Sequence, residues 1–238
     1  MKKHGVRMVF ITVILAVLFW TTAGTVMAEE RQPVDLTVGI VPGAEYSHTK
    51  WFVVIPMKLT PQMAVWLESA DGQFIGTVYV TEKAASGNWR GGKDVSRPEA
   101  LPVYFHRADL NRSSNGAADT VSGATPKKGD DDSQTWTGSF SLAAGKYRIM
   151  AEVNSSFDYN SNYPEQDENV NGQPSLVYAA GFEINESGKE LQVRGNREFD
   201  LQPVGHGDPT GESGVMIPDL SGMTSALDML DRMYAAVN

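Results

Sequence analysis

An Asp-Gly dipeptide at 71–72, placed between two apolar runs, is the feature that most constrains how this chain can fold. Before it, Met63, Val65 and Leu67 alternate with Ala64, Trp66 and Glu68, and after it a run rich in β-branched and aromatic residues extends over 74–81. A period of two places successive side chains on opposite faces of a strand. Two such runs joined by Asp-Gly are the strongest short-range signal of a β-hairpin. The sequence therefore predicts an antiparallel hairpin here.

Further strand-like runs follow the same pattern along the chain, separated by Gly- and Pro-rich turns. They cover 34–41, 51–57, 101–105, 134–140, 146–153, 176–184 and 190–194. The strand-like runs do not alternate with long helical runs, so the pattern does not predict a parallel, doubly wound sheet. The polar stretch 82–133 is read as a long loop, and loops of that length are usually functional or mobile. The predicted class is all-β, an antiparallel Ig-like β-sandwich with long loops.

The end of the chain shows a different period. Spacings of three and four separate its apolar residues Leu220, Met223, Leu227, Leu230, Tyr234 and Val237. This pattern predicts one C-terminal amphipathic helix, packed on the sandwich or, alternatively, binding a partner. The expected organisation is a signal peptide over 1–28, a β-sandwich domain over 29–204, and a Gly-rich segment with the helix over 205–238.

The first 28 residues have the three-part layout of a secretory signal peptide. Lys2, Lys3 and Arg7 precede an apolar run, and Val26-Met27-Ala28 puts small residues at the positions that a signal peptidase recognises. An uncleaved membrane anchor is the alternative, since the apolar run is nearly long enough to span a bilayer. We expect cleavage and a periplasmic or secreted protein that is peripheral to a membrane at most.

Composition excludes several classes of site. The chain has no Cys, which rules out disulfides, thiolate metal sites and a cysteine nucleophile. From Glu29 onward it carries 17 basic and 29 acidic residues, a formal charge of −12. Such a surface repels nucleic acid and anionic lipid, so no nucleic-acid partner is expected. The histidines lack metal-ligand spacing and no Gly-x-Ser-x-Gly elbow is present. An enzyme is therefore not the favoured interpretation.

The most specific motif runs from Asp119 to Thr125 and includes Ser122, Gly123 and Ala124. It resembles the acceptor sequence of bacterial proteins that carry covalent FMN, where the final Thr is modified by a flavin transferase. The resemblance implies that Thr125 forms the phosphoester. It also implies that Asp119 guides the transferase, while the small Gly123 and Ala124 give it access to the backbone.

Two other interpretations of polar segments stay open. The stretch Asp119–Gly123 can form an Asx or Ser/Thr turn without any ligand, and Pro126 departs from the flavin acceptors, which usually have Ser or Thr there. Oxygen-bearing residues at Asp158, Asn160 and Asn162 resemble the start of a calcium loop, but the Gly and Glu that complete an EF-hand are missing. Trp89, in a Gly-rich loop, either contacts a ligand or covers a turn.

Several ordered stretches together resemble one family of predicted bacterial periplasmic proteins, domain of unknown function 2271. They are Ala64–Glu68, Asp71–Phe74, Thr77–Thr81, Trp89, Arg97–Val103, Asp119–Pro126, Gly145–Tyr147 and Asn171–Tyr178. The hairpin and the Gly-Lys-Tyr strand also resemble the Ig-like domain of the flagellar hook-capping protein, which implies a sandwich but no function.

The family has no assigned activity, and its genes often lie near flavin transferases and PepSY-type membrane proteins. The resemblance therefore implies an accessory or binding component of an extracytoplasmic, flavin-associated redox system. A flavin transferase or a PepSY-type membrane redox protein is the implied partner. One alternative is an electron carrier with FMN attached to Thr125. A second is a calcium-stabilised binding module.

Overall fold

A computed structural model describes residues 31–89, 97–108, 122–123, 134–167, 170–187, 190–193 and 195–238. The expected signal peptide, 1–28, lies outside these residues. The strands are β1 (Gln32–Pro42), β2 (His48–Phe52), β3 (Ile55–Leu59), β4 (Gln62–Ser69), β5 (Phe74–Thr81), β6 (Ser122–Gly123), β7 (Gln134–Leu142), β8 (Gly145–Asn154), β9 (Leu176–Ser187), β10 (Glu190–Val193), β11 (Glu198–Asp200), β12 (Gln202–His206) and β13 (Leu230–Val237). The helices are α1 (Glu82–Ser86), η1 (Pro98–Ala100), α2 (Pro102–Arg107) and η2 (Ser225–Asp228). Among the described residues, no helix has the length and apolar character needed to cross a membrane.

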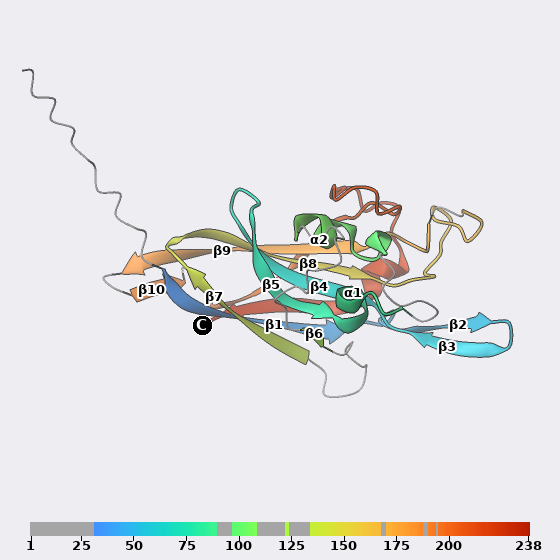
Figure 1. The fold of residues 1–238 in the computed structure, drawn as a ribbon, viewed down its shortest axis with the longest axis horizontal. Helices are drawn as coiled ribbons and strands as arrows, with labels where there is room; N and C mark the ends of the chain where they lie inside the picture. The colour runs from blue at the N-terminus through green and yellow to red at the C-terminus, as the bar shows by residue number, and fades with distance from the viewer. Residues whose placement is uncertain are drawn as a thin grey trace, which may run out of the picture.

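Two sheets pack face to face, as Figure 1 shows. The smaller sheet has the order β11-β13-β1-β7, and the larger has β10-β9-β8-β4-β5-β6 with β12 beside β9. Every described pairing is antiparallel except that of β6 with β5. The predicted antiparallel β-sandwich is confirmed, and the hairpin around Asp71-Gly72 is β4–β5.

The core is formed by the side chains that alternate along the strands and point inward. Leu36, Val38 and Ile40 on β1 are fully buried against Met63 and the other inward-facing residues of the larger sheet. Strand β4 is buried on both faces, because Trp66 and its neighbours on the other face lie in a second cluster under η1 and α2. This third layer, made of short helices and loops, forms the outer surface on which the candidate site lies.

The predicted C-terminal helix is wrong, because residues 230–237 form β13, which pairs with β1. A bulge interrupts the alternation in β13: Val41 lies opposite Arg232 but Pro42 lies opposite Leu230, which leaves Asp231 as an extra residue. Beyond the bulge the buried positions of β13 alternate. The predicted stripe does not share one face, since Tyr234 lies on the opposite side of β13 from Val237, and Leu227, in η2, is 38% exposed.

Two further local predictions are corrected. Residues 101–105 belong to α2 rather than to a strand, since Pro102 opens the helix, where its missing N–H is not needed. The single run expected over 51–57 is split between β2 and β3, which form a two-stranded hairpin joined at Val53 and Val54. This hairpin projects from one end of the sandwich (Figure 1).

Candidate functional site

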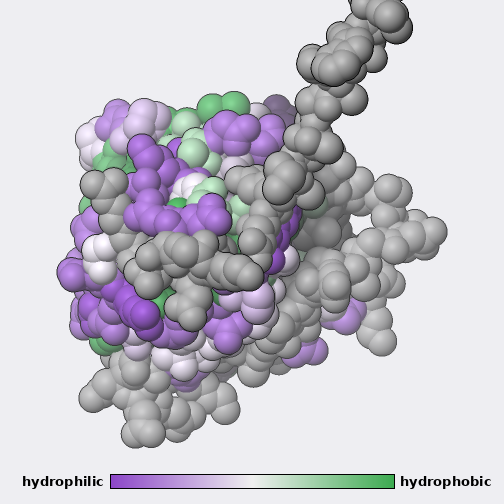
Figure 2. Space-filling view, turned by 90° about the vertical axis from the view of Figure 1, so that its left-hand side faces the viewer, coloured by the Kyte–Doolittle hydropathy of each residue, from purple (hydrophilic) through white to green (hydrophobic). Residues whose placement is uncertain are grey.

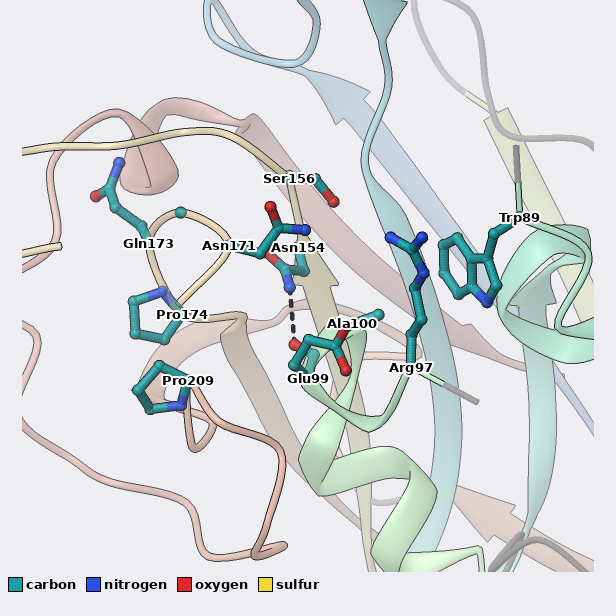
Figure 3. Close-up of a pocket in the computed structure, with 11 residues that line it drawn as sticks. Trp89, Arg97, Glu99, Ala100, Asn154, Ser156, Asn171, Gln173, Pro174 and Pro209 are labelled. Atoms are coloured by element: carbon teal, nitrogen blue, oxygen red, sulfur yellow. Dashed lines mark hydrogen bonds between the residues drawn. The ribbon is translucent and has the colours of Figure 1, made fainter. Parts of the chain in front are cut away.

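A polar recess lies on the outer layer of the larger sheet (Figure 3). The recess is shallow and open: the space between its walls is about 350 Å³ with open solvent included. It is lined by Trp89, Arg97, Glu99, Ala100, Asn154, Ser156, Asn171, Gly172, Gln173, Pro174 and Pro209. These residues come from the segment after α1, from η1, from the end of β8 and from two loops. Five separate parts of the chain therefore build one concave surface.

The guanidinium of Arg97 lies over the indole ring of Trp89, with its carbon 5.2 Å from the ring centroid. Figure 3 shows the two side chains side by side at one rim of the recess. A cation held against an aromatic face is partly immobilised, so less side-chain entropy is lost when it contacts a ligand. This rim is suited to an anionic group or to a planar ring. For Trp89 the sequence allowed two roles, contact with a ligand or cover of a turn; the side chain lies in the wall of the recess.

The opposite side of the recess is held by hydrogen bonds to backbone groups. The Asn154 side-chain amide donates to the carbonyl of Glu99 at 3.1 Å and ties η1 to the end of β8. The turn 171–173 is joined to the 157–158 segment by two backbone bonds, Phe157 N–H to Asn171 O and Gln173 N–H to Asp158 O. Much of the wall is thereby fixed before any ligand arrives.

Gly172 is expected to be essential to this wall. Its φ of +119° disfavours any side chain, and an added Cβ would lie 2.8 Å from the backbone nitrogen of Asp158. We expect Gly172→Ala to lower the free energy of unfolding by about 1–3 kcal/mol, as strained backbone positions do. The measurement is urea unfolding followed by circular dichroism.

Gly195 supplies the control, because its φ is +90° but nothing lies within 4 Å of its added Cβ. Gly195→Ala therefore carries the conformational strain without the clash, and it should cost less. Equal costs for the two variants would contradict the close approach at Gly172.

A carboxylate beneath the recess anchors the neighbouring helix. Glu152 on β8 is fully buried, and it accepts the backbone N–H of Val103 at 3.2 Å and that of Tyr104 at 2.8 Å. The hydroxyl of Ser175 donates to the same carboxylate at 2.5 Å. The N–H groups of Val103 and Tyr104 belong to the first turn of α2, where they have no acceptor within the helix. Glu152 therefore holds α2 on the sheet as a capping residue supplied by another strand.

Burial raises the pKa of Glu152 to about 7, even though the bonds from Ser175, Tyr104 and Val103 favour the charged form. A carboxyl with such a pKa is often catalytic. Here the side chain has no exposed surface, so no substrate reaches it in this conformation. The sequence analysis missed this residue, although a Glu inside an apolar alternation at 149–153 was a usable signal.

Asp208 organises the loop that supplies Pro209 to the recess. Its carboxylate accepts the backbone N–H and the hydroxyl of both Thr210 and Ser213. Burial alone would raise the pKa of Asp208, but the bonds from Thr210 and Ser213 together lower it. The loop therefore stabilises the charged form of Asp208, whose carboxylate oxygens already accept hydrogen bonds from within the loop.

Of the flavin-like motif, the structure describes the backbone of Ser122 and Gly123 only. These two residues form β6 and pair in parallel with Val80 and Thr81 at the end of β5. Asp119, Ala124 and Thr125 lie outside the described residues, as do the side chains of Ser122 and Gly123. The role assigned to Thr125 therefore stays a prediction.

The loop considered for calcium has other contacts. Asp158 accepts the hydroxyl of Ser225 at 2.5 Å, and the amide of Asn160 donates to the Gly222 carbonyl at 2.9 Å. No group of three or more His, Cys, Asp or Glu able to hold a metal is found among the described residues. Calcium binding here stays a prediction, while the visible role of the loop is to dock the 222–225 segment.

The recess unites stretches that carry the family resemblance. Trp89, the start of Arg97–Val103 and the start of Asn171–Tyr178 are far apart in sequence and meet there. Residues 57–162 match the model of a family described as "Predicted periplasmic protein (DUF2271)". The resemblance is thereby confirmed, and the description supports a location outside the cytoplasm. Comparison with curated proteins and with solved structures gives no match.

Proposed function

With a domain of this predicted periplasmic family as its centre, we propose that the protein is a non-catalytic binding component of an extracytoplasmic, flavin-associated redox system. One observation carries the proposal. Three of the eight resembling stretches meet at a polar recess with a cation–aromatic rim. The recess contains several amide side chains and one stacked cation. Polar groups of this kind orient a polar, partly planar ligand in a binding site.

Chemistry argues for binding over catalysis. Burial raises the pKa of Glu152 to about 7, but that carboxyl is sealed beneath α2. Among the described residues that line the recess, Ser156 carries a hydroxyl, but no hydrogen bond joins it to a base that could activate it as a nucleophile. FMN is the natural probe, because its phosphate can pair with Arg97 and its ring can lie on Trp89.

Calorimetric titration of the protein with FMN tests the recess. We expect saturable binding that Arg97→Gln weakens about tenfold, since the charge-assisted bond to phosphate is lost. Arg232→Gln is the matched control, because Arg232 lies on β13 and pairs with Glu198 and Asp200. Failure of FMN to bind, or equal losses in both variants, would reject the recess as a flavin site.

The second candidate is an electron carrier with FMN on Thr125, and β6 is the observation that favours it. Ser122 and Gly123 extend the larger sheet beyond β5, so the middle of the motif is held in an extended conformation. An extended segment is the form in which enzymes commonly take up peptide substrates. Transfer would join the Thr125 Oγ to the FMN phosphorus and release the leaving group of the flavin donor.

Intact-mass spectrometry after co-expression with a flavin transferase tests this candidate. We expect one FMN adduct on the wild type, no adduct on Thr125→Ala, and an unchanged adduct on Thr120→Ala from the same motif. A wild type that stays unmodified, while a known acceptor in the same cells is labelled, would reject covalent flavin and leave the binding role.

A further inference from the structure

The β2–β3 hairpin ends in an exposed apolar tip, defined here as residues 51–55. The exposed fractions are 62% for Trp51, 36% for Phe52, 96% for Val53, 77% for Val54 and 59% for Ile55. Other large exposed apolar side chains among the described residues are scattered. Five consecutive ones on a single projection are unusual for a water-facing surface.

The apex is conformationally strained. Val53 has a φ of 58°, a left-handed conformation that is costly for a β-branched residue. Two-residue hairpin turns usually place Gly, Asn or Asp at such positions. The chain thus places two valines at the apex although a less strained pair exists, and the result is an apolar point.

The hairpin is held to the body along one side, from Lys50 to Phe52 of the tip. The ammonium of Lys50 pairs with Glu165 at 2.5 Å and lies 5.3 Å from the ring centroid of Tyr159. The rings of Phe52 and Phe157 meet edge to face at 5.4 Å. The loop once considered for calcium therefore supports the hairpin, and the tip is presented in a fixed direction.

The opposite end of the molecule has another character. Figure 2 shows that end, where the described surface is largely hydrophilic with small hydrophobic areas between. The hairpin lies at the far end from this view (Figure 1). The described part of the molecule is therefore polarised along its length, with a dominant apolar projection at one end.

We propose that the apolar tip inserts into the interfacial layer of a lipid bilayer and holds the protein at a membrane surface. From Trp51 to the apex the strand rises about 7 Å, at about 3.3 Å per residue. That length matches the depth of roughly 5–10 Å to which interfacial apolar faces enter a bilayer. Trp is enriched at this depth, where its ring is apolar and its N–H remains near water.

Charge supports lipid over a protein partner. The segment 46–61 contains no acidic residue and carries Lys50 and Lys58, whereas the chain from Glu29 has a formal charge of −12. Glu165 neutralises Lys50, so Lys58 is the charge that the hairpin itself adds beside the tip. A convex point also suits a deformable lipid surface, whereas a protein partner would need a matching cavity.

The test is flotation of the exported protein with vesicles of phosphatidylethanolamine containing a minority of phosphatidylglycerol. We expect the wild type to float with the vesicles, at high salt as well as low, because apolar insertion is not screened. Val53→Gly combined with Val54→Asn should lower the partition coefficient about tenfold or more, from the lost apolar transfer. That pair favours the turn without changing the charge, so the melting temperature should be unchanged or higher.

Val215→Asn is the matched control, because Val215 is also 62% exposed but lies away from the hairpin. Its partitioning should equal that of the wild type. A wild type that does not float would overturn the proposal, as would an equal loss in the Val215 variant. Tip-dependent self-association without vesicle binding, seen by sedimentation, would also overturn it and assign the tip to a second copy of the chain.

Discussion

Glu152→Ala is expected to lower the free energy of unfolding by about 3 kcal/mol. The substitution leaves two backbone N–H groups of α2 and the Ser175 hydroxyl without their acceptor. Each buried unsatisfied donor costs about 1–3 kcal/mol, and relief of the buried carboxyl offsets part of the sum. Urea unfolding of wild type and variant measures the difference. A loss below about 0.5 kcal/mol, the range of ordinary surface substitutions, would contradict the capping role.

The same residue predicts a pH dependence with a definite sign. Its pKa is about 7 in the folded protein, against the ordinary value of 4.5 for a glutamate in an unfolded chain. Between these values the folded state binds a proton that the unfolded state has released. Stability from this site is therefore greatest below about pH 4.5, falls as pH rises towards 7, and is constant above. The full change is about 3 kcal/mol.

Glu152→Gln isolates this contribution, because other carboxyls titrate in the same range. The difference in unfolding free energy between wild type and Glu152→Gln should change by that amount between about pH 4.5 and 7. The same substitution at the exposed Glu82 of α1 serves as the control variant. A pH-independent difference at Glu152 would show that the folded carboxyl is already ionised at low pH.

The period of two predicted most of the sandwich correctly because burial acts locally on alternating side chains. In β8, Ile149, Ala151 and Val153 face the core as their spacing indicates. The errors arose where a single residue or a long-range contact decided the outcome. Asp231 bulges out of β13, and α2 depends on a cap that β8 supplies from 48 to 49 residues away.

The candidate site was predictable in its parts but not in its assembly. Trp89, Arg97 and the 171–174 turn were each singled out in the sequence, yet no local spacing shows that they line one recess. The apolar tip was hidden for another reason. Trp51 to Met57 has the composition of a buried strand. No other strand among the described residues pairs with β2 or β3, and the run stays exposed.

Two tryptophans provide the second large prediction. Trp66 has no exposed surface, its indole N–H donates to Glu68 at 2.9 Å, and its ring lies 5.5 Å from that of Tyr104. Trp66→Ala should cost about 3–5 kcal/mol, from lost burial and a large cavity under α2. For a domain of this size that corresponds to a fall in melting temperature on the order of 10 °C.

Trp51→Ala is the paired control, since its side chain is 62% exposed. It should change stability by less than about 0.5 kcal/mol while weakening vesicle binding. The loss of stability in Trp66→Phe should lie between those of the two alanine variants. The variant keeps a ring against Tyr104 but loses the hydrogen bond to Glu68. Glu68 still has its ion pairs with Arg107 and Arg148, at 3.8 and 3.7 Å. Thermal unfolding of the three variants separates the residues by role: one tryptophan would stabilise the fold and the other would act only at the membrane. Equal destabilisation by both alanine variants would mean that the hairpin packs against the core, and the lipid proposal would fail with it.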